Sequence, residues 1–140
     1  MLKVILKIVI LLIVGAVVWV RVAPDDPLRW HVAAEGSEMG HIDGEKDHVY
    51  REAVTGDVNA RMAAFDAQIR ATPRTKVLAG SLAEGQITYV TRSRLMAFPD
   101  YTTLTLRDAT TVELYSRARF GKSDLGVNRA RIESWIKALG

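Results

Sequence analysis

The first apolar positions of the chain form an unbroken run rather than a periodic pattern. Residues 8–20 include no charged side chain, Lys7 precedes them, and Trp19 stands near their end. As a helix with a rise of ~1.5 Å per residue, the stretch 4–20 extends about 25 Å, the short end of what a bilayer requires. A lysine that reaches back to the interface and an interfacial tryptophan suit such a span. The pattern predicts a membrane anchor in residues 1–22 that contacts the lipid bilayer through residues 4–20.

A cleaved signal peptide is the rival interpretation, because a basic start followed by a short apolar core fits both. Arg21 stands where signal-peptide cleavage needs a small residue, so we favour an uncleaved anchor. A buried core helix would need more surrounding protein than this chain supplies. Lys3 and Lys7 before the span favour an N-terminus inside the cell. This predicts a single-pass protein whose domain lies outside the cytoplasmic membrane.

Residues 23–56 show neither a helical nor a strand period over any sustained length. They combine prolines, glycines and mixed charges, which is typical of a linker or of an extended arm lying on a domain. Trp30 is the one large apolar anchor in the segment. We expect it either at the membrane interface or docked on the fold.

Helical spacing begins after Asp57. Val58, Met62, Phe65 and Ile69 recur at this spacing, Asp57 or Thr55 is the expected N-cap, and Pro73 ends the pattern. Four segments rich in β-branched and aromatic residues follow, separated by turn residues. Short separators make successive strands antiparallel neighbours. The segments are TKVLAGSL, QITYVTRSRLMAF, YTTLTLR and TVELYSRARF.

The last apolar pattern is again helical. Ile132, Trp135 and Leu139 share one face, and Ser123 or Asp124 is the expected cap. The sequence therefore predicts an α+β fold in which residues 57–140 form a two-layer α-β-β-β-β-α domain. Its four antiparallel strands are covered by both helices on one face.

Arginines alternate with apolar residues at the ends of two predicted strands. Arg92 and Arg94 share a face, and Arg117 and Arg119 lie opposite Leu114 and its apolar neighbours. The arginines are expected on the open face of the sheet, where they either solvate it or bind an acidic lipid headgroup or metabolite. An apolar tip near the following turn suits a membrane surface or a protein partner. The residues of this tip are Met96, Phe98 and Tyr101.

Composition and motifs limit the kinds of catalytic, metal-binding and nucleic-acid-binding site that the chain can have. The chain has no cysteine, which excludes disulfides, thiolate metal sites and cysteine nucleophiles. A formal charge of +3 from 19 basic and 16 acidic residues does not indicate a nucleic-acid partner. His41 and His48 alternate with acids in HIDGEKDH, but the spacing of a calcium loop is missing. No serine stands in a hydrolase motif. We expect no metal, no cofactor and no catalytic residue.

Two runs in the C-terminal half of the chain resemble the sequence pattern of a known family. The runs TRSRLMAFPDYTTLTL and VELYSRARFGKSDLGVNRARIESWIKAL resemble the bacterial and chloroplast family called domain of unknown function 1499. The hallmark of that family is a Ser-Arg-Ser-Arg-like strand end, then Gly-x-Ser-Asp-Leu-Gly-x-Asn, then an arginine-bearing helix. Residues 116–132 match it closely, and the likeness covers roughly residues 57–139. Ala118 departs from the pattern, since a second serine is expected there. The segment RVAPDDPLRWHV is similar to the membrane-tethered members of the family.

The motif is interpreted physically as a strand-to-helix junction. Gly121 and Gly126 allow backbone conformations closed to other residues. Ser123 and Asp124 accept hydrogen bonds from amides of the first helical turn, and Asn128 extends the polar network. Ser116 is the motif residue at the strand end. The alternative is an external phosphate or carboxylate at the same helix end, held by three basic side chains. These are Arg119, Lys122 and Arg129.

The resemblance implies no catalytic role, because none is known to us for the family. We expect a membrane-anchored, non-catalytic interaction protein, an accessory component of the envelope or of a membrane protein complex. A lipid- or small-anion-binding module is the alternative. An enzyme built on Asp124, Asn128 and the arginines is a more distant third.

Overall fold

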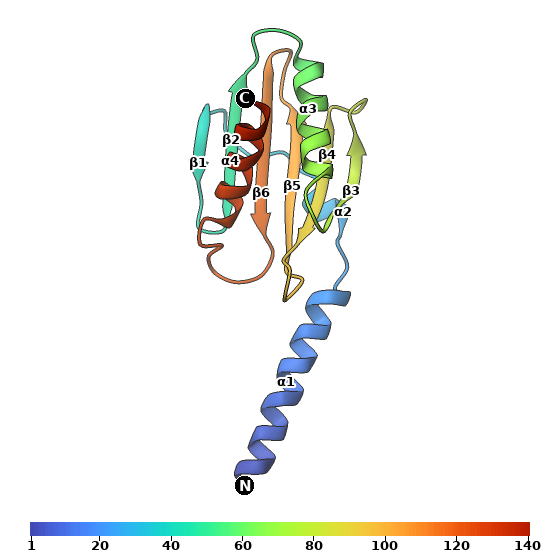
Figure 1. Ribbon diagram of the computed structural model, residues 1–140, viewed down its shortest axis with the longest axis vertical. Helices are drawn as coiled ribbons and strands as arrows, with labels where there is room; N and C mark the ends of the chain where they lie inside the picture. Colours follow the sequence, from blue (N-terminus) through green and yellow to red (C-terminus); the bar gives the residue numbers. More distant parts are fainter.

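The computed structural model describes residues 1–140, and one helix stands apart from the rest. Helix α1 (Leu2–Val22) projects from one end of a folded domain that holds all other elements (Figure 1). By length and composition α1 could cross a membrane, a criterion that a signal sequence also meets. The other elements are α2 (Pro27–Trp30), β1 (Gly40–Asp43), β2 (Asp47–Ala53), α3 (Val58–Arg70), β3 (Thr75–Ser81), β4 (Gln86–Arg92), β5 (Pro99–Leu106), β6 (Thr111–Ala118) and α4 (Val127–Leu139).

The domain is built on one antiparallel sheet, which confirms the predicted α+β fold. Its strand order is β1-β2-β6-β5-β4-β3, so it has six strands rather than the four expected. The additional strands lie in residues 40–53, within the segment 23–56 that was expected to be an arm or linker. The folded domain therefore begins before residue 57. The strand period is missing there because β2 buries His48 and Arg51 instead of apolar side chains.

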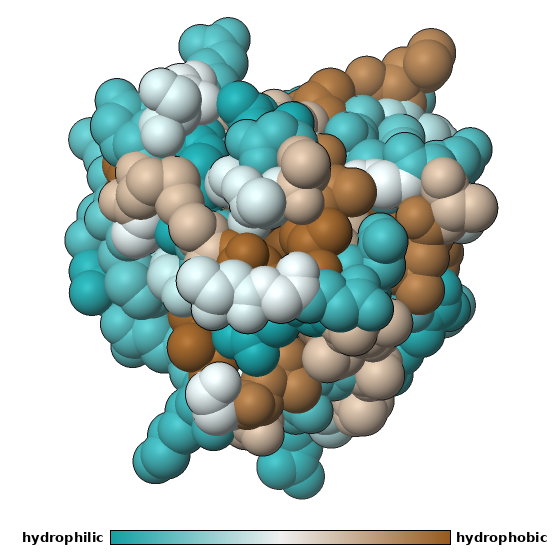
Figure 2. Space-filling model, turned by 90° about the horizontal axis from the view of Figure 1, so that it is seen from above, coloured by the Kyte–Doolittle hydropathy of each residue, from teal (hydrophilic) through white to brown (hydrophobic).

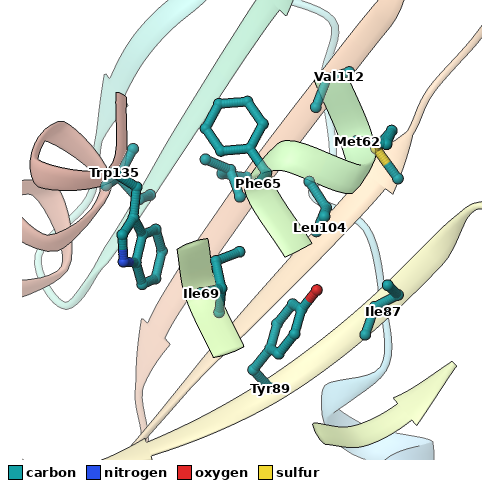
Figure 3. Close-up of a cluster of buried hydrophobic side chains, with 10 residues drawn as sticks. Met62, Phe65, Ile69, Ile87, Tyr89, Leu104, Val112 and Trp135 are labelled. Atoms are coloured by element: carbon teal, nitrogen blue, oxygen red, sulfur yellow. The ribbon is translucent and has the colours of Figure 1, made fainter. Parts of the chain in front are cut away.

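Helices α3 and α4 cover one face of the sheet and enclose the hydrophobic core (Figure 3). Phe65 and Ile69 of α3 and Ile132 of α4 are completely buried, as the helical spacing predicts. Asp57 is the N-cap of α3, because its carboxylate accepts hydrogen bonds from the amides of Asn59 and Ala60. The core residues are Met62, Phe65, Ile69, Ile87, Tyr89, Leu104, Val112, Leu114, Ile132 and Trp135.

The other face of the sheet is covered by the chain itself. Residues 23–39, called the arm below, run across it from the end of α1 to the start of β1. Trp30, in the short helix α2, is buried and stacks on Tyr101 with the ring centroids 4.0 Å apart. Of the two positions expected for Trp30, the structure has the docked one. The sheet therefore has no open face along the arm.

Candidate functional site

The arm-covered face is organised around a buried carboxylate. Glu113 of β6 is fully buried and accepts hydrogen bonds from the Arg51 Nε at 2.6 Å and from the backbone amide of Ala34 at 2.9 Å. Arg107 Nη1 lies 3.5 Å from the same carboxylate. Both arginines also donate to arm carbonyls, Arg51 to Glu35 and Arg107 to Ala34. Because buried charges need partners, this cluster ties the arm to the sheet.

Arg117 holds the middle of the arm. Its Nη2 donates to the Trp30 carbonyl at 2.8 Å, and its Nη1 donates to the Val32 carbonyl at 3.1 Å. The guanidinium also lies over the Tyr115 ring, 4.1 Å from the centroid. Burial lowers the pKa of Arg117 to about 10, so the group is still charged at neutral pH. Arg117 lies on the predicted face, but backbone carbonyls of the arm occupy it.

Arg92 joins the sheet to the end of α1. Its Nη1 donates to the Val20 carbonyl at 3.2 Å and to the Ala97 carbonyl at 3.0 Å, and its Nη2 lies 3.0 Å from Asp25 Oδ2. Tyr101 donates its hydroxyl hydrogen to the other oxygen of Asp25. Burial and this hydrogen bond raise the pKa of Tyr101 to about 12. Tyr101 is thus a buried contact of the arm rather than part of an exposed tip.

The remaining candidate basic residues fall into two groups. Arg119 donates to the Pro24 carbonyl at 2.8 Å, and Arg129 pairs with Asp43 at 2.6 Å and with Glu133 at 2.8 Å. Arg94 and Lys122 are exposed and have no hydrogen bond or ion pair within the chain. The structure therefore does not gather the six basic residues into one site.

The Gly-x-Ser-Asp-Leu-Gly-x-Asn motif forms the expected junction between β6 and α4. Asp124 accepts hydrogen bonds from the amides of Gly126 at 3.0 Å and Asn128 at 3.1 Å, and from the Asn128 side chain at 2.8 Å. Ser123 accepts from the Leu125 amide at 3.1 Å. Gly121 and Gly126 have φ values of 87° and 77°, the left-handed region that favours glycine.

The polar network of the junction continues into the sheet. Asn128 is fully buried and accepts from Arg131 Nη1 at 3.0 Å, and the same nitrogen lies 3.0 Å from Asp100 Oδ2. Burial raises the pKa of the Asp100 carboxyl, and Arg131 opposes that rise. Ser116 is buried and shares a 2.6 Å hydrogen bond with Thr102. These side chains satisfy one another, as expected for a structural junction.

A cleft of about 320 Å³ lies beside the junction. Phe98 and Phe120 stand on its sides, with the ring centroids 6.2 Å apart, and Asp100 and Arg131 are among its polar lining residues. Met96 and Phe98 are partly exposed, as predicted for the apolar tip, whereas Tyr101 is buried against Trp30 of the arm.

The histidines of HIDGEKDH form a hydrogen-bonded chain. His48 Nδ1 lies 2.9 Å from Asp43 Oδ1, and His48 Nε2 lies 2.8 Å from His41 Nδ1. When His48 is neutral and its Nδ1 donates to Asp43, its Nε2 accepts the hydrogen of His41 Nδ1. Desolvation by burial lowers the pKa of His48, although Asp43 acts in the opposite direction. No group of three or more side chains has an arrangement suited to a metal ion.

The sequence analysis did not predict the contacts between the arm carbonyls and the two arginines Arg51 and Arg107. The register of β2 and β6 places Arg51 opposite Glu113, but β2 itself was not predicted. Every residue has a backbone carbonyl, so the sequence could not indicate which carbonyls would accept hydrogen bonds from the arginines. The only clue in the sequence to a polar cluster was that Glu113 and Arg117 share one face of the same predicted strand.

Fold and site together define a small α+β domain that follows an apolar helix and is closed on one face by its own N-terminal arm. The family described as protein of unknown function (DUF1499) matches residues 20–139, and the chain belongs to this family. The match includes the arm, β1 and β2 as well as the motif. No curated protein matches the chain.

Proposed function

We propose that this is a membrane-anchored, non-catalytic interaction protein, an accessory component of the envelope or of a membrane protein complex. In this proposal α1 is an uncleaved anchor of a bacterial inner membrane, and the domain lies on the periplasmic side, as Lys3 and Lys7 before the span favour. The partner is a protein in the same membrane.

The observation that carries the proposal is the bonded connection between α1 and the domain. Val20 and Ala23 are buried, and Arg92 binds the Val20 carbonyl while pairing with Asp25. Arg119 binds the carbonyl of Pro24. A domain tied to its anchor in this way keeps one height and one orientation over the bilayer. That arrangement suits a protein which presents a surface to a neighbour in the membrane.

The candidate side chains are bonded to other groups of the protein, which supports a non-catalytic role. Asp124 accepts three hydrogen bonds, one from the amide of Gly126 and two from Asn128 of α4, and Asp100 is paired with Arg131. The sheet arginines donate to arm carbonyls, which argues against the alternative of an acidic lipid or metabolite on that face. We therefore do not extend the proposal to a ligand held by Arg92, Arg117 or Arg119.

The test is co-purification of the tagged full-length protein from membranes in mild detergent. The double variant Arg92→Gln/Arg119→Gln loosens the domain from α1, and Lys137→Gln, which changes an exposed residue without an ion pair, is the matched control. We expect a stoichiometric membrane protein with the wild type and the control, and its loss in the double variant. Circular dichroism must show that this variant still unfolds cooperatively. A protein that purifies alone in all three forms contradicts the proposal.

A further inference from the structure

Two loops at the α1 end of the domain expose apolar side chains. We call residues 93–98, between β4 and β5, and residues 119–126, between β6 and α4, the membrane-end loops. Leu95 is 81 % exposed and Leu125 is 91 % exposed. Both loops lie at the end from which α1 projects (Figure 1). Figure 2 looks onto the opposite end, where hydrophilic side chains form most of the outline.

The two membrane-end loops are neighbours in space. Phe98 of the first and Phe120 of the second pack with ring centroids 6.2 Å apart. Both loops also line the cleft of about 320 Å³ beside the junction. The loops that carry Leu95 and Leu125 therefore lie side by side at this end of the domain, although they are distant in the sequence.

The position of these loops is fixed relative to the anchor. Arg21, in the last turn of α1, donates from Nη2 to the Leu95 carbonyl at 3.2 Å. Arg92 binds Val20 of α1 and Ala97 of the first loop through the same nitrogen. If residues 4–20 span the hydrocarbon region, the first loop must lie at the depth where the span ends, which is the headgroup layer.

The charges of the loops complement an anionic lipid surface. Each loop carries one exposed basic residue without a partner, Arg94 beside Leu95 and Lys122 near Leu125. Glu45, on the adjoining turn between β1 and β2, is an exposed acid at this end, and its carbonyl accepts from the Asp124 amide. Exposed apolar side chains flanked by basic ones are typical of segments that bind membrane interfaces.

From this arrangement we infer that the membrane-end loops are a second membrane contact of the protein. Leu95, Met96 and Leu125 enter the interface of the bilayer in which α1 is anchored, and Arg94 and Lys122 bind anionic headgroups. The inference rests on the proposed function, because it requires α1 to span the membrane. It assigns this end of the domain to lipid, so a protein partner must bind elsewhere.

The experiment uses the full chain in lipid vesicles and exploits the absence of cysteine. An environment-sensitive fluorophore is attached at Leu95→Cys or Leu125→Cys. Leu82→Cys is the matched control, because Leu82 is an exposed leucine in the turn at the opposite end of the sheet. Val9→Cys reports on α1. Vesicles contain phosphatidylcholine with or without phosphatidylglycerol, and some carry a nitroxide quencher at the headgroup or deep in the acyl chains.

We expect the probes at positions 95 and 125 to emit at shorter wavelength than the probe at 82 and to be quenched by the headgroup nitroxide. Aqueous iodide should quench only the probe at 82. The shift should be larger with phosphatidylglycerol, and Arg94→Gln/Lys122→Gln should abolish that difference. Equal behaviour at 95, 125 and 82, with the probe at 9 quenched deep in the bilayer, overturns the inference and leaves the anchor intact. A probe at 9 that is not quenched overturns the anchor and the inference together.

Discussion

The two faces of the sheet are covered by different kinds of contact. Helices α3 and α4 pack on one face through apolar contacts, and ten buried side chains, five from the helices and five from the strands, form a single cluster there. The arm covers the other face, where Arg51, Arg107 and Arg117 donate to arm carbonyls around the buried Glu113. Apolar contacts tolerate exchanges that conserve volume, whereas a buried charge requires its own partner. The helix-covered face therefore supplies most of the apolar burial, and the arm-covered face fixes where α1 joins the domain.

The largest expected effect is on the arm-covered face. Glu113→Gln keeps the shape but removes the buried charge partner of Arg51 and leaves only the exposed Glu38, 3.8 Å away. This should lower the free energy of unfolding by roughly 3–5 kcal/mol. The measurement is urea unfolding of the full-length protein in detergent. Glu84→Gln, which changes an exposed carboxylate in the turn after β3, is the control and should leave stability unchanged. A loss below about 1 kcal/mol for Glu113→Gln, the value typical of exposed ion pairs, would contradict the comparison.

Loss of the polar contacts of Asp124, at the end of the sheet, should lower the free energy of unfolding by an intermediate amount. Asp124→Ala removes the acceptor of the Asn128 amide and of the buried Asn128 side chain. The expected loss is about 1–3 kcal/mol, the range for a lost cap and an unsatisfied buried donor. The same urea titration measures it, with Ser134→Ala in exposed α4 surface as the control. An unchanged midpoint would mean that Asp124 does not stabilise the junction.

A shape change on the helix-covered face should cost least among the substitutions. Ile69 is fully buried in the apolar cluster, and Ile69→Leu keeps its volume and polarity. Such exchanges usually cost less than about 1.5 kcal/mol. If this variant is destabilised as much as Glu113→Gln, the two faces do not differ in the way described.

A pH titration tests the contribution of His48, a buried polar residue of β2. Burial lowers the pKa of His48 below its ordinary value of 6.5, and the groups that act on it are Asp43, His41 and Arg129. The unfolded chain then takes up a proton before the folded one, so stability is complete above about pH 6.5 and decreases as the pH falls below it. Unfolding free energies measured between about pH 7 and pH 5 should show this slope. His48→Gln should reduce it, and an unchanged slope in that variant would assign it to another group.

The helix-covered face could be predicted from the sequence, because its signal is apolar periodicity. The spacing of Phe65 and Ile69 predicted α3, the turn residues separated β3 to β6, and Asp57 was correctly named as the cap of α3. The N-cap of α4 is Gly126 rather than the expected Ser123 or Asp124, because the helix begins later than expected. Asp124 still accepts a hydrogen bond from the Asn128 amide. The face of β6 that carries Arg117 was also predicted correctly.

The arm-covered face could not be predicted, because its contacts are polar and distant in the sequence. Strand β2 places Tyr50 toward the helices and Arg51 toward the arm, so it lacks the alternation that marks a half-buried strand. Trp30 was the arm residue singled out as an apolar anchor, and its type is compatible both with the membrane interface and with docking on the fold. The partners of Arg117 are backbone carbonyls, which any residue could supply.

Hydrogen–deuterium exchange of the full-length protein in lipid tests the central claim, that the arm is an integral layer of the domain. The amide of Ala34 donates to Glu113, and the amide of Trp30 donates to the Asp26 carbonyl. We predict that both exchange as slowly as amides in the central strand β6 and that Glu113→Gln speeds the exchange of Ala34 before that of β6. If the arm amides exchange within seconds while β6 is protected, the arm is a loose linker and the account is contradicted.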